Sequence, residues 1–294
     1  MSTDPNPAPI VVGVDPDPDR RVALTWAADE ARRRRRPLTL VYAQGEPVPG
    51  YRPEGGRPSW ERWREELHTT GNDVLESAAA FVEERLPGAE VSVLLAEGPP
   101  AWVLAEQSQH AELVVIGSRH PAARRGLFAS TAVALPLTAR AACPVVVLRE
   151  SEHTTRQPPY LVVGVDGSPD AAAAVDFAFD EADLRGANLR ALYAWHTPVL
   201  GVMDEHAAVR EWRQLLAETV AGRTVAHPSV ELHHEVVEGH PVQVLTDASA
   251  HALGLVVGAR GRGGFRGMLL GSVSQGVLHH AHCPVITVPH GRHP

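Results

Sequence analysis

The chain repeats itself, and this repeat limits the possible folds more than any other feature of the sequence. Five segments recur in the same order in both halves. They are PIVVGVD and YLVVGVD (9–15 and 160–166), LTLVYA and LRALYA (38–43 and 189–194), AEGPP and VEGHP (96–100 and 237–241), ELVVIGSR and GLVVGAR (112–119 and 254–260), and AACPVVVL and AHCPVITV (141–148 and 281–288). We therefore expect two copies of one domain in tandem.

The two copies divide the chain near its middle. The offset between them falls from 151 residues (Pro9 to Tyr160) to 141 (Ala96 to Val237), and the difference lies in a Pro/Gly-rich loop at 45–59. Insertions are tolerated best in such loops. A polar, proline-bearing stretch at 150–159 is typical of a linker. The predicted domains are therefore residues 1–150 and 151–294.

Each copy alternates short apolar, β-branched runs with longer helical patterns. Several runs are apolar throughout, which is typical of strands buried on both faces. The predicted strands are 9–14, 38–43, 90–95, 112–116 and 144–148, then 160–165, 189–194, 230–236, 254–258 and 284–288. The predicted helices include 20–36, 60–86, 170–184 and 203–225. This alternation predicts two tandem doubly wound α/β domains, each with a roughly five-stranded parallel sheet and helices on both faces.

Composition excludes several classes of function. The net charge is −8, which argues against nucleic acid or an anionic membrane surface as a partner. All 27 basic residues are arginine, so the chain has no lysine for a Schiff base or a P-loop. No apolar run reaches the roughly 18 residues of a membrane span, and the first residues do not look like a signal peptide. Cys143 and Cys283 occupy equivalent positions, so we expect two free thiols and a cytoplasmic protein.

The clearest binding motif follows the fourth predicted strand of the second copy. There the sequence GARGRGGFRGMLLGSV places Gly258, Gly261, Gly271 and Ser272 in the pattern Gly-x2-Gly-x9-Gly-Ser, directly before a helical pattern. Glycines let a polyphosphate approach the backbone, and a helix N-terminus attracts anions. Residues 258–273 contain three arginines and no carboxylate. A negatively charged ligand is therefore expected, although a glycine-rich loop can also be only a tight turn.

Asp166 ends the first strand of the second copy in the sequence GVDGS. A carboxylate at this edge of a parallel sheet can accept hydrogen bonds from a ribose or a base. Equally, it can cap the next helix or stabilise the following turn.

Together, GVDGS, the glycine motif and the closing HCPV resemble the universal stress protein family in its tandem form, over about 9–150 and 160–288. The resemblance implies that ATP, with Mg²⁺ as a possible companion, is the cofactor. It implies that Asp166 and Gly164 lie beside the adenosine and that Ala194 offers backbone groups to the adenine. It further implies that Val257, Gly258 and Gly261 line the ribose and phosphate side, and that Gly271, Ser272 and Val273 hold the phosphates. Arg262, with Arg260 and Arg266, is expected to add positive charge.

The first copy departs from this pattern. Asp15, Ala43 and Gly117 match, but His120 replaces Gly261 and Ser130-Thr131 replaces Gly271-Ser272. A Cβ at a former glycine can block a phosphate or forbid a positive φ. Pro136 is expected to interrupt the following helix. We therefore predict a degenerate, weaker site made of Asp15, Ala43, Gly117 and Thr131.

Three other features have plainer readings. The arginines at 32–36 are expected to close a helix in solvent rather than to bind nucleic acid. His279, His280, His282 and Cys283 lie too close together on one helix to converge on a metal, so no metal site is predicted. Trp60, Trp63 and Leu67 have the spacing of a buried helix face.

These observations predict an ATP-binding regulator of the stress response with no catalytic residues. The alternative is an enzyme that uses the same pocket, either a slow ATPase or a phosphotransferase that phosphorylates itself at Ser272. A structural protein without ligand is a third class. The expected partners are an adenine nucleotide and an unidentified protein. The last strand of each copy is an edge strand, which suggests pairing either between the two copies or between chains, so a homodimer is possible.

Overall fold

The computed structural model describes residues 7–17, 21–44, 60–118, 131–149, 154–196, 205–262 and 269–291. Packing divides the chain into two compact units, Met1–Leu137 and Thr138–Pro294, called the first and second unit below. The division by packing falls before the last strand of the first sequence copy. That strand therefore counts with the second unit, although it belongs to the first copy.

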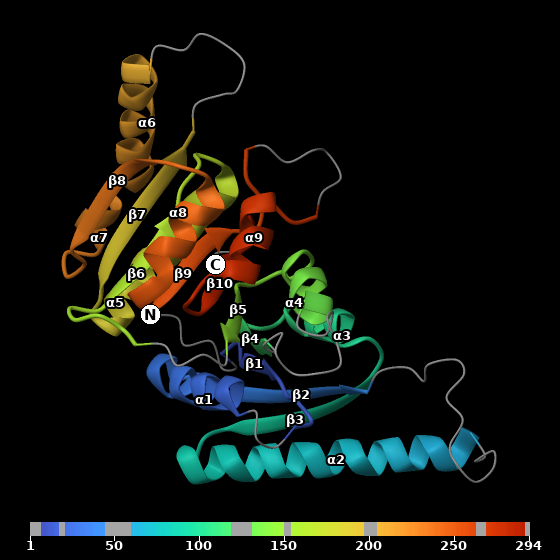
Figure 1. Ribbon diagram of the computed structural model, residues 1–294. Helices are drawn as coiled ribbons and strands as arrows, with labels where there is room; N and C mark the ends of the chain where they lie inside the picture. Colours follow the sequence, from blue (N-terminus) through green and yellow to red (C-terminus); the bar gives the residue numbers. More distant parts are fainter. Residues whose placement is uncertain are drawn as a thin grey trace. The chain divides into compact units, whose positions relative to one another are not determined.

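The first unit is a parallel sheet in the order β3-β2-β1-β4. Its strands are β1 (Ile10–Gly13), β2 (Leu38–Gln44), β3 (Val91–Glu97) and β4 (Leu113–Ser118). Its helices are α1 (Val22–Arg34), α2 (Trp60–Arg85) and α3 (Pro100–Gln107), and α4 (Thr131–Thr138) runs across the division. Figure 1 shows α2 lying along β2 and β3, which it contacts.

The second unit has the strand order β5-β10-β9-β6-β7-β8, parallel except where β10 pairs with β5. Its strands are β5 (Val145–Arg149), β6 (Tyr160–Gly164), β7 (Asn188–Trp195), β8 (Leu232–Glu238), β9 (Gly254–Gly258) and β10 (Val285–Val288). Its helices are α5 (Pro169–Arg185), α6 (Glu205–Val220), α7 (Arg223–Ala226), α8 (Pro241–Ala248), a 3₁₀ turn (Ser249–His251) and α9 (Ser272–His280). Contacts join α5 to α6 and α8 to α9, as expected if each pair covers one face of the sheet (Figure 1).

All ten predicted strands are present, with bounds that differ by at most a few residues. Leu255, Val256 and Val257 are all buried, which confirms that β9 is covered on both faces. The expected pairing between the last strands of the two copies is also present, and it is antiparallel: Val285 lies opposite Val147.

Two expectations about helices were wrong. The helical pattern at 203–225 is broken by Gly222, whose φ of 80° ends α6 and starts the short α7. Pro136 does not interrupt its helix, because α4 continues through it to Thr138. Pro136 is the sixth residue of α4, so its ring removes only the one helical hydrogen bond that its N–H would donate to Ala132 O, and α4 ends two residues later.

Both cysteines are free and buried, as expected. Burial raises the pKa of the Cys283 thiol to about 12, so this group is protonated and unreactive at neutral pH. No helix within the described parts of the chain is both long and apolar enough to cross a membrane.

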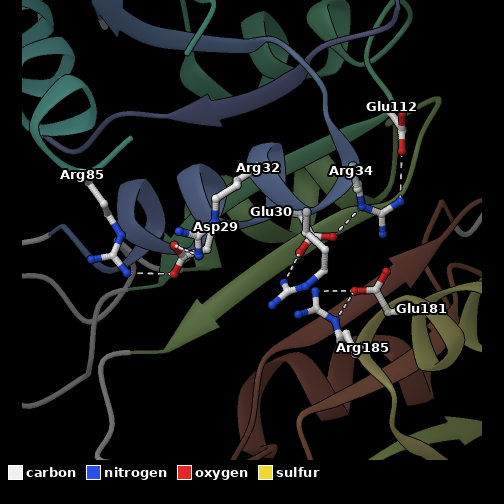
Figure 2. Close-up of polar contacts among 9 residues, drawn as sticks. Asp29, Glu30, Arg32, Arg34, Arg85, Glu112, Glu181 and Arg185 are labelled. Atoms are coloured by element: carbon white, nitrogen blue, oxygen red, sulfur yellow. Dashed lines mark hydrogen bonds and ion pairs between the residues drawn. The ribbon is translucent and has the colours of Figure 1, made fainter. Parts of the chain in front are cut away.

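A buried carboxylate occupies the same place in the first long helix of each copy. Glu30 in α1 is 0% exposed and accepts a hydrogen bond of 2.5 Å from Arg34 Nε, and Glu181 in α5 is 1% exposed and accepts one of 2.5 Å from Arg185 Nε (Figure 2). Arg34 also reaches Glu112, at 3.0 Å. Glu30 and Glu181 are each paired with an arginine one helical turn further on.

The run of arginines that closes α1 is largely engaged within the first unit. Arg32 contacts Asp29, as Figure 2 shows. Arg33 contacts Glu30, and Arg36 contacts Glu112. Arg35 adopts φ 55° and caps the helix. These contacts favour the structural reading of the run over a nucleic-acid patch.

Replacing Arg185 by alanine leaves the Glu181 carboxylate buried without the guanidinium that it contacts. Breaking a buried ion pair in this way costs about 3–5 kcal/mol of the free energy of unfolding. Arg32→Ala breaks an exposed pair (64% and 32% exposed) and should cost at most about 1 kcal/mol. Urea unfolding of both variants measures the difference, and equal costs would contradict the structural role given to the Glu181 pair.

Candidate functional site at the carboxyl ends of β6, β7 and β9

Asp166 joins the turn after β6 to the loop after β9. Its Oδ1 accepts a hydrogen bond of 2.9 Å from the backbone N–H of Ser168, and its Oδ2 accepts one of 2.9 Å from the N–H of Arg262. The first of these bonds confirms the reading in which Asp166 stabilises the turn that follows it. The carboxylate stabilises its own turn and also holds the glycine-containing loop at the edge of the sheet.

Two glycines of the motif lie against this turn. A Cβ on Gly261 would lie 2.4 Å from Asp166 Oδ2, and one on Gly258 would lie 2.7 Å from the backbone carbon of Asp170. Asp170 Oδ2 in turn accepts hydrogen bonds from Arg260 N (3.0 Å) and Nε (3.4 Å). The sequence reasoning assigned these glycines to the approach of a ligand. The structure gives them a prior reason, because the loop cannot pack against the β6–α5 turn with a side chain at either position.

The third glycine starts α9. Gly271 N–H donates to Ala259 O at 2.8 Å, and the φ of −69° and ψ of 148° at Gly271 suit any residue. A Cβ there would meet its nearest neighbours at 3.4 Å, which is close to ordinary contact. Ser274, in the first turn, donates its hydroxyl to Gly258 O at 2.6 Å and so ties the helix start to the end of β9. No side chain caps α9, so its first N–H groups carry the partial positive charge of a helix N-terminus.

The other predicted residues lie at the same edge of the sheet. Gly164 ends β6, and Val257, the penultimate residue of β9, is buried. Ala194 lies near the end of β7 and pairs with Val237 of β8. A Cβ on Gly167 would lie 3.4 Å from the Nη1 of Arg262, which places that guanidinium at the turn after Asp166. All the predicted residues of the second copy therefore lie along the carboxyl ends of β6, β7 and β9 or in the segments that follow.

An aromatic cluster stands beside this edge. Trp212 of α6 stacks on Tyr193 (ring centroids 5.9 Å apart) and contacts Trp195 (4.8 Å). Burial raises the pKa of the Tyr193 hydroxyl above its ordinary value; nearby Arg262 lowers it and Asp166 raises it further. These couplings place the Tyr193 hydroxyl within electrostatic reach of Asp166 and Arg262.

The first unit repeats the turn but not its surroundings. Asp15 Oδ1 accepts a hydrogen bond of 2.9 Å from Asp17 N, as Asp166 does from Ser168. However, Pro16 replaces Gly167, whose φ of 76° a proline ring forbids. Among the described residues, a Cβ on Gly117 would find its nearest neighbour, Ala23, 3.8 Å away, while the counterparts of the residues that crowd Gly258 lie outside the described part of the chain.

The remaining predicted positions of the first copy are only partly covered. Ala43 pairs with Ala96 of β3, and Thr131 is the first residue of α4. Val133 is the third residue of α4, and Ser274, which ties α9 to β9, is the third residue of α9. The first copy therefore has a valine where the second has this serine. His120 and Ser130 of this copy lie outside the described residues, as does Arg266 in the loop of the second copy. A cavity of about 230 Å³ opens beside Asp15 and is also lined by Arg21, Thr70 and Asp73.

Within the described residues, no group of three or more His, Cys, Asp or Glu side chains is arranged as a metal site. His279 and His280 lie side by side at the end of α9, with ring centroids 6.2 Å apart. Burial lowers the pKa of His279, and the neighbouring His280 and Arg149 lower it further. His279 is therefore mostly neutral at pH 7.

The fold places the protein in the doubly wound α/β class, and comparison with known proteins identifies the family within that class. The model of the universal stress protein family matches residues 8–149 and again 160–289. A universal stress protein of Mycobacterium tuberculosis is 37% identical over 287 residues, which is 94% of this chain and 95% of that protein. A second, from Mycolicibacterium smegmatis, is 35% identical over 95% of this chain and 96% of its own.

A solved structure agrees in fold. The crystal structure of a universal stress protein from Archaeoglobus fulgidus superposes with a TM-score of 0.71 at 17% identity and covers 96% of each chain. The chain belongs to the universal stress protein family.

Sequence reasoning missed four residues at the site: Gly167, Asp170, Ser274 and Trp212. Three of them could have been found because the two sequence copies differ at these positions. When the copies are aligned, Gly167 corresponds to Pro16 and Ser274 to Val133. Trp212 corresponds to Gly71 at the offset of 141 (Ala96 to Val237). Gly71 lies against Tyr42 and Gln44, the counterparts of the two residues that Trp212 contacts. Asp170 has an aspartate in both copies, so the comparison of copies could not single it out.

Gly258→Ala and Gly117→Ala form a matched pair of substitutions at equivalent glycines. Gly258→Ala places a Cβ against the backbone of Asp170 and should cost about 1–3 kcal/mol, as overpacking does. Gly117→Ala meets nothing nearer than 3.8 Å among the described residues and should cost less than about 0.5 kcal/mol. Hydrogen exchange at the first turn of α5 should rise in the Gly258 variant alone. Equal effects of the two changes would show that the packing at Gly258 is wrongly assigned.

Proposed function

We propose that the second unit binds ATP at the carboxyl ends of β6, β7 and β9 and that the protein is a nucleotide-responsive regulator. The observation that carries this proposal is the loop that Asp166 holds at the sheet edge through Arg262 N. The loop leads from β9 to Gly271 and the uncapped start of α9. An open α/β sheet binds its ligands at this edge, and a helix N-terminus suits a phosphate.

The proposed roles follow from position. The first N–H groups of α9, at Ser272 and Val273, would bind the phosphates, with the Arg262 guanidinium and any Mg²⁺ adding positive charge. Gly271 would let the phosphates approach, because the packing around it does not itself require a glycine. Gly258 and Gly261 would act indirectly, by keeping the loop close to Asp166.

The adenosine would lie towards β6 and β7. Ala194 would offer backbone groups at the end of β7, while Gly164 and Val257 would line the floor beneath. Asp166 has both oxygens engaged with backbone N–H groups, but each carboxylate oxygen has a second lone pair for a ribose hydroxyl. The first unit, with Asp15, Ala43, Gly117 and Thr131 in these places, would bind more weakly.

Binding without fast turnover fits the groups present. Residues 258–273 contain no Asp, Glu or His, so the loop can stabilise charge but has no group to take a proton from water. Asp166 is held by two backbone N–H groups, which favours a positioning role. We infer a cytoplasmic regulator whose protein partner recognises the nucleotide-bound form, whether the protein is a monomer or a homodimer.

Gly271→Val tests the ligand rather than the fold. The backbone at Gly271 suits valine and the Cβ has room, so the melting temperature should change by at most about 2 °C. The valine methyl groups would project where the phosphates are proposed to lie, and the affinity for ATP with Mg²⁺ should fall at least tenfold. Titration calorimetry of the natural chain, Gly271→Val and the first-unit control Gly117→Ala measures this. Unchanged affinity in a folded Gly271 variant would overturn the proposed phosphate site.

Bound ATP should remain mostly intact for many minutes. Enzymes typically turn over at about 1–1,000 per second, which requires positioned proton acceptors that this loop lacks. Phosphate release with Mg²⁺ is compared between the natural chain, Ser272→Ala and Asp166→Asn. Turnover above about one per second, abolished by either change while binding persists, would favour the enzyme class.

A further inference from the structure

The two described arginines of the loop after β9 are held in different ways. Arg260 is paired through its Nε with Asp170 Oδ2, at 3.4 Å. Arg262 is held by its backbone, whose N–H donates to Asp166 Oδ2 at 2.9 Å. Its guanidinium makes no hydrogen bond or ion pair within the described parts of the chain, and the residue is exposed. The Arg262 side chain is therefore free to turn while its backbone stays in place.

The guanidinium of Arg262 lies beside the turn after β6. A Cβ on Gly167, the residue after Asp166, would lie 3.4 Å from Arg262 Nη1 and 2.9 Å from Cδ2 of Leu215 in α6. Burial raises the pKa of the Tyr193 hydroxyl in β7 and nearby Arg262 lowers it, so the guanidinium also lies close to β7. The charged group is thus found between the turn after β6, β7 and α6.

An adenosine would need the same place. Under the proposed function, the base and the ribose lie between the end of β7, at Ala194, and the carboxylate of Asp166. A guanidinium against Gly167 takes part of that space, and two groups cannot fill it together. Binding of the nucleotide would therefore have to displace the Arg262 side chain.

The first copy lacks both members of this contact. When the copies are aligned, Pro16 corresponds to Gly167 and Pro121 corresponds to Arg262. Proline carries no charge, and it has no N–H to donate to Asp15 as Arg262 donates to Asp166. The contact therefore belongs to the copy with the intact glycine motif.

We propose, on the basis of the nucleotide site proposed above, that Arg262 makes this site selective for nucleotides that carry a polyphosphate. Without a ligand the guanidinium occupies the adenosine end, so every nucleotide must displace it at a cost in free energy. A nucleoside offers the displaced group no new contact. A triphosphate offers it charge-assisted hydrogen bonds, which offset this cost.

A fixed contact is the alternative arrangement. The plane of a guanidinium can stack on an aromatic ring. Arg262 would then stay in place and bind the adenine of adenosine and of ATP alike. The two arrangements predict opposite results when the side chain is removed, because displacement makes adenosine bind more tightly without Arg262 and stacking makes it bind more weakly.

The test is titration calorimetry of the full chain with adenosine, and separately with ATP and Mg²⁺, for the natural chain and Arg262→Ala. The affinity for adenosine should rise about threefold or more, because the natural chain admits it only in the fraction of molecules whose Arg262 has turned away. The affinity for ATP should fall about tenfold or more, because the phosphates lose a charged donor.

Two controls accompany this variant. Alanine keeps the N–H that Asp166 binds, so the loop should stay in place, and circular dichroism confirms that the variant is folded. Arg210→Ala removes an equal charge from an exposed position of α6 and should change neither affinity.

Three results with a natural chain that binds ATP would overturn this proposal alone. A lower affinity of Arg262→Ala for adenosine would show stacking, and an unchanged one would show that the guanidinium does not block the site. An unchanged affinity for ATP would show that the displaced group does not bind the phosphates. A natural chain that does not bind ATP would instead refute the nucleotide site, and with it the role given to Arg262.

Discussion

The hydrogen bond from Arg262 N–H to Asp166 Oδ2, 2.9 Å long, is the contact on which the candidate site depends. The same carboxylate bonds Ser168 N, so one side chain fixes both the turn after β6 and the loop after β9. The backbone of Asp170 leaves no space for a Cβ at Gly258, and the Asp166 carboxylate leaves none at Gly261. The loop can therefore pass close to the turn and reach α9 with its first N–H groups uncapped.

The two copies show how one sheet supports two different edges. Strand order and register repeat closely, because the buried apolar strands of both copies must pair in the same way. The turn after the first strand does not repeat, since Pro16 cannot adopt the φ of Gly167. Trp212 and Ser274 brace the edge in the second unit, where the first copy has Gly71 and Val133. The differences thus gather in the segments that would meet a ligand.

Much of this was predictable from the sequence. Uninterrupted apolar runs such as 254–258 predicted the central strands, because burial on both faces leaves a clear pattern. The position of Asp166 at a strand end was also predictable. The structural reason for a glycine at position 258 was not predictable, because it is the close packing of Gly258 against the backbone of Asp170, which lies in a distant segment of the sequence. Pro136 misled the prediction, since local propensity fixes neither the length of a helix nor the tertiary contacts that stabilise it.

We propose that the intact glycine motif of the second unit creates a nucleotide site which the first unit lacks in full form. Native mass spectrometry of the purified chain with ATP counts the nucleotides held by each molecule. The account predicts a dominant species with one nucleotide, and a second nucleotide only at much higher concentration. Two nucleotides bound together at the same low concentration would contradict it, because the substitutions in the first copy would then have no effect on binding.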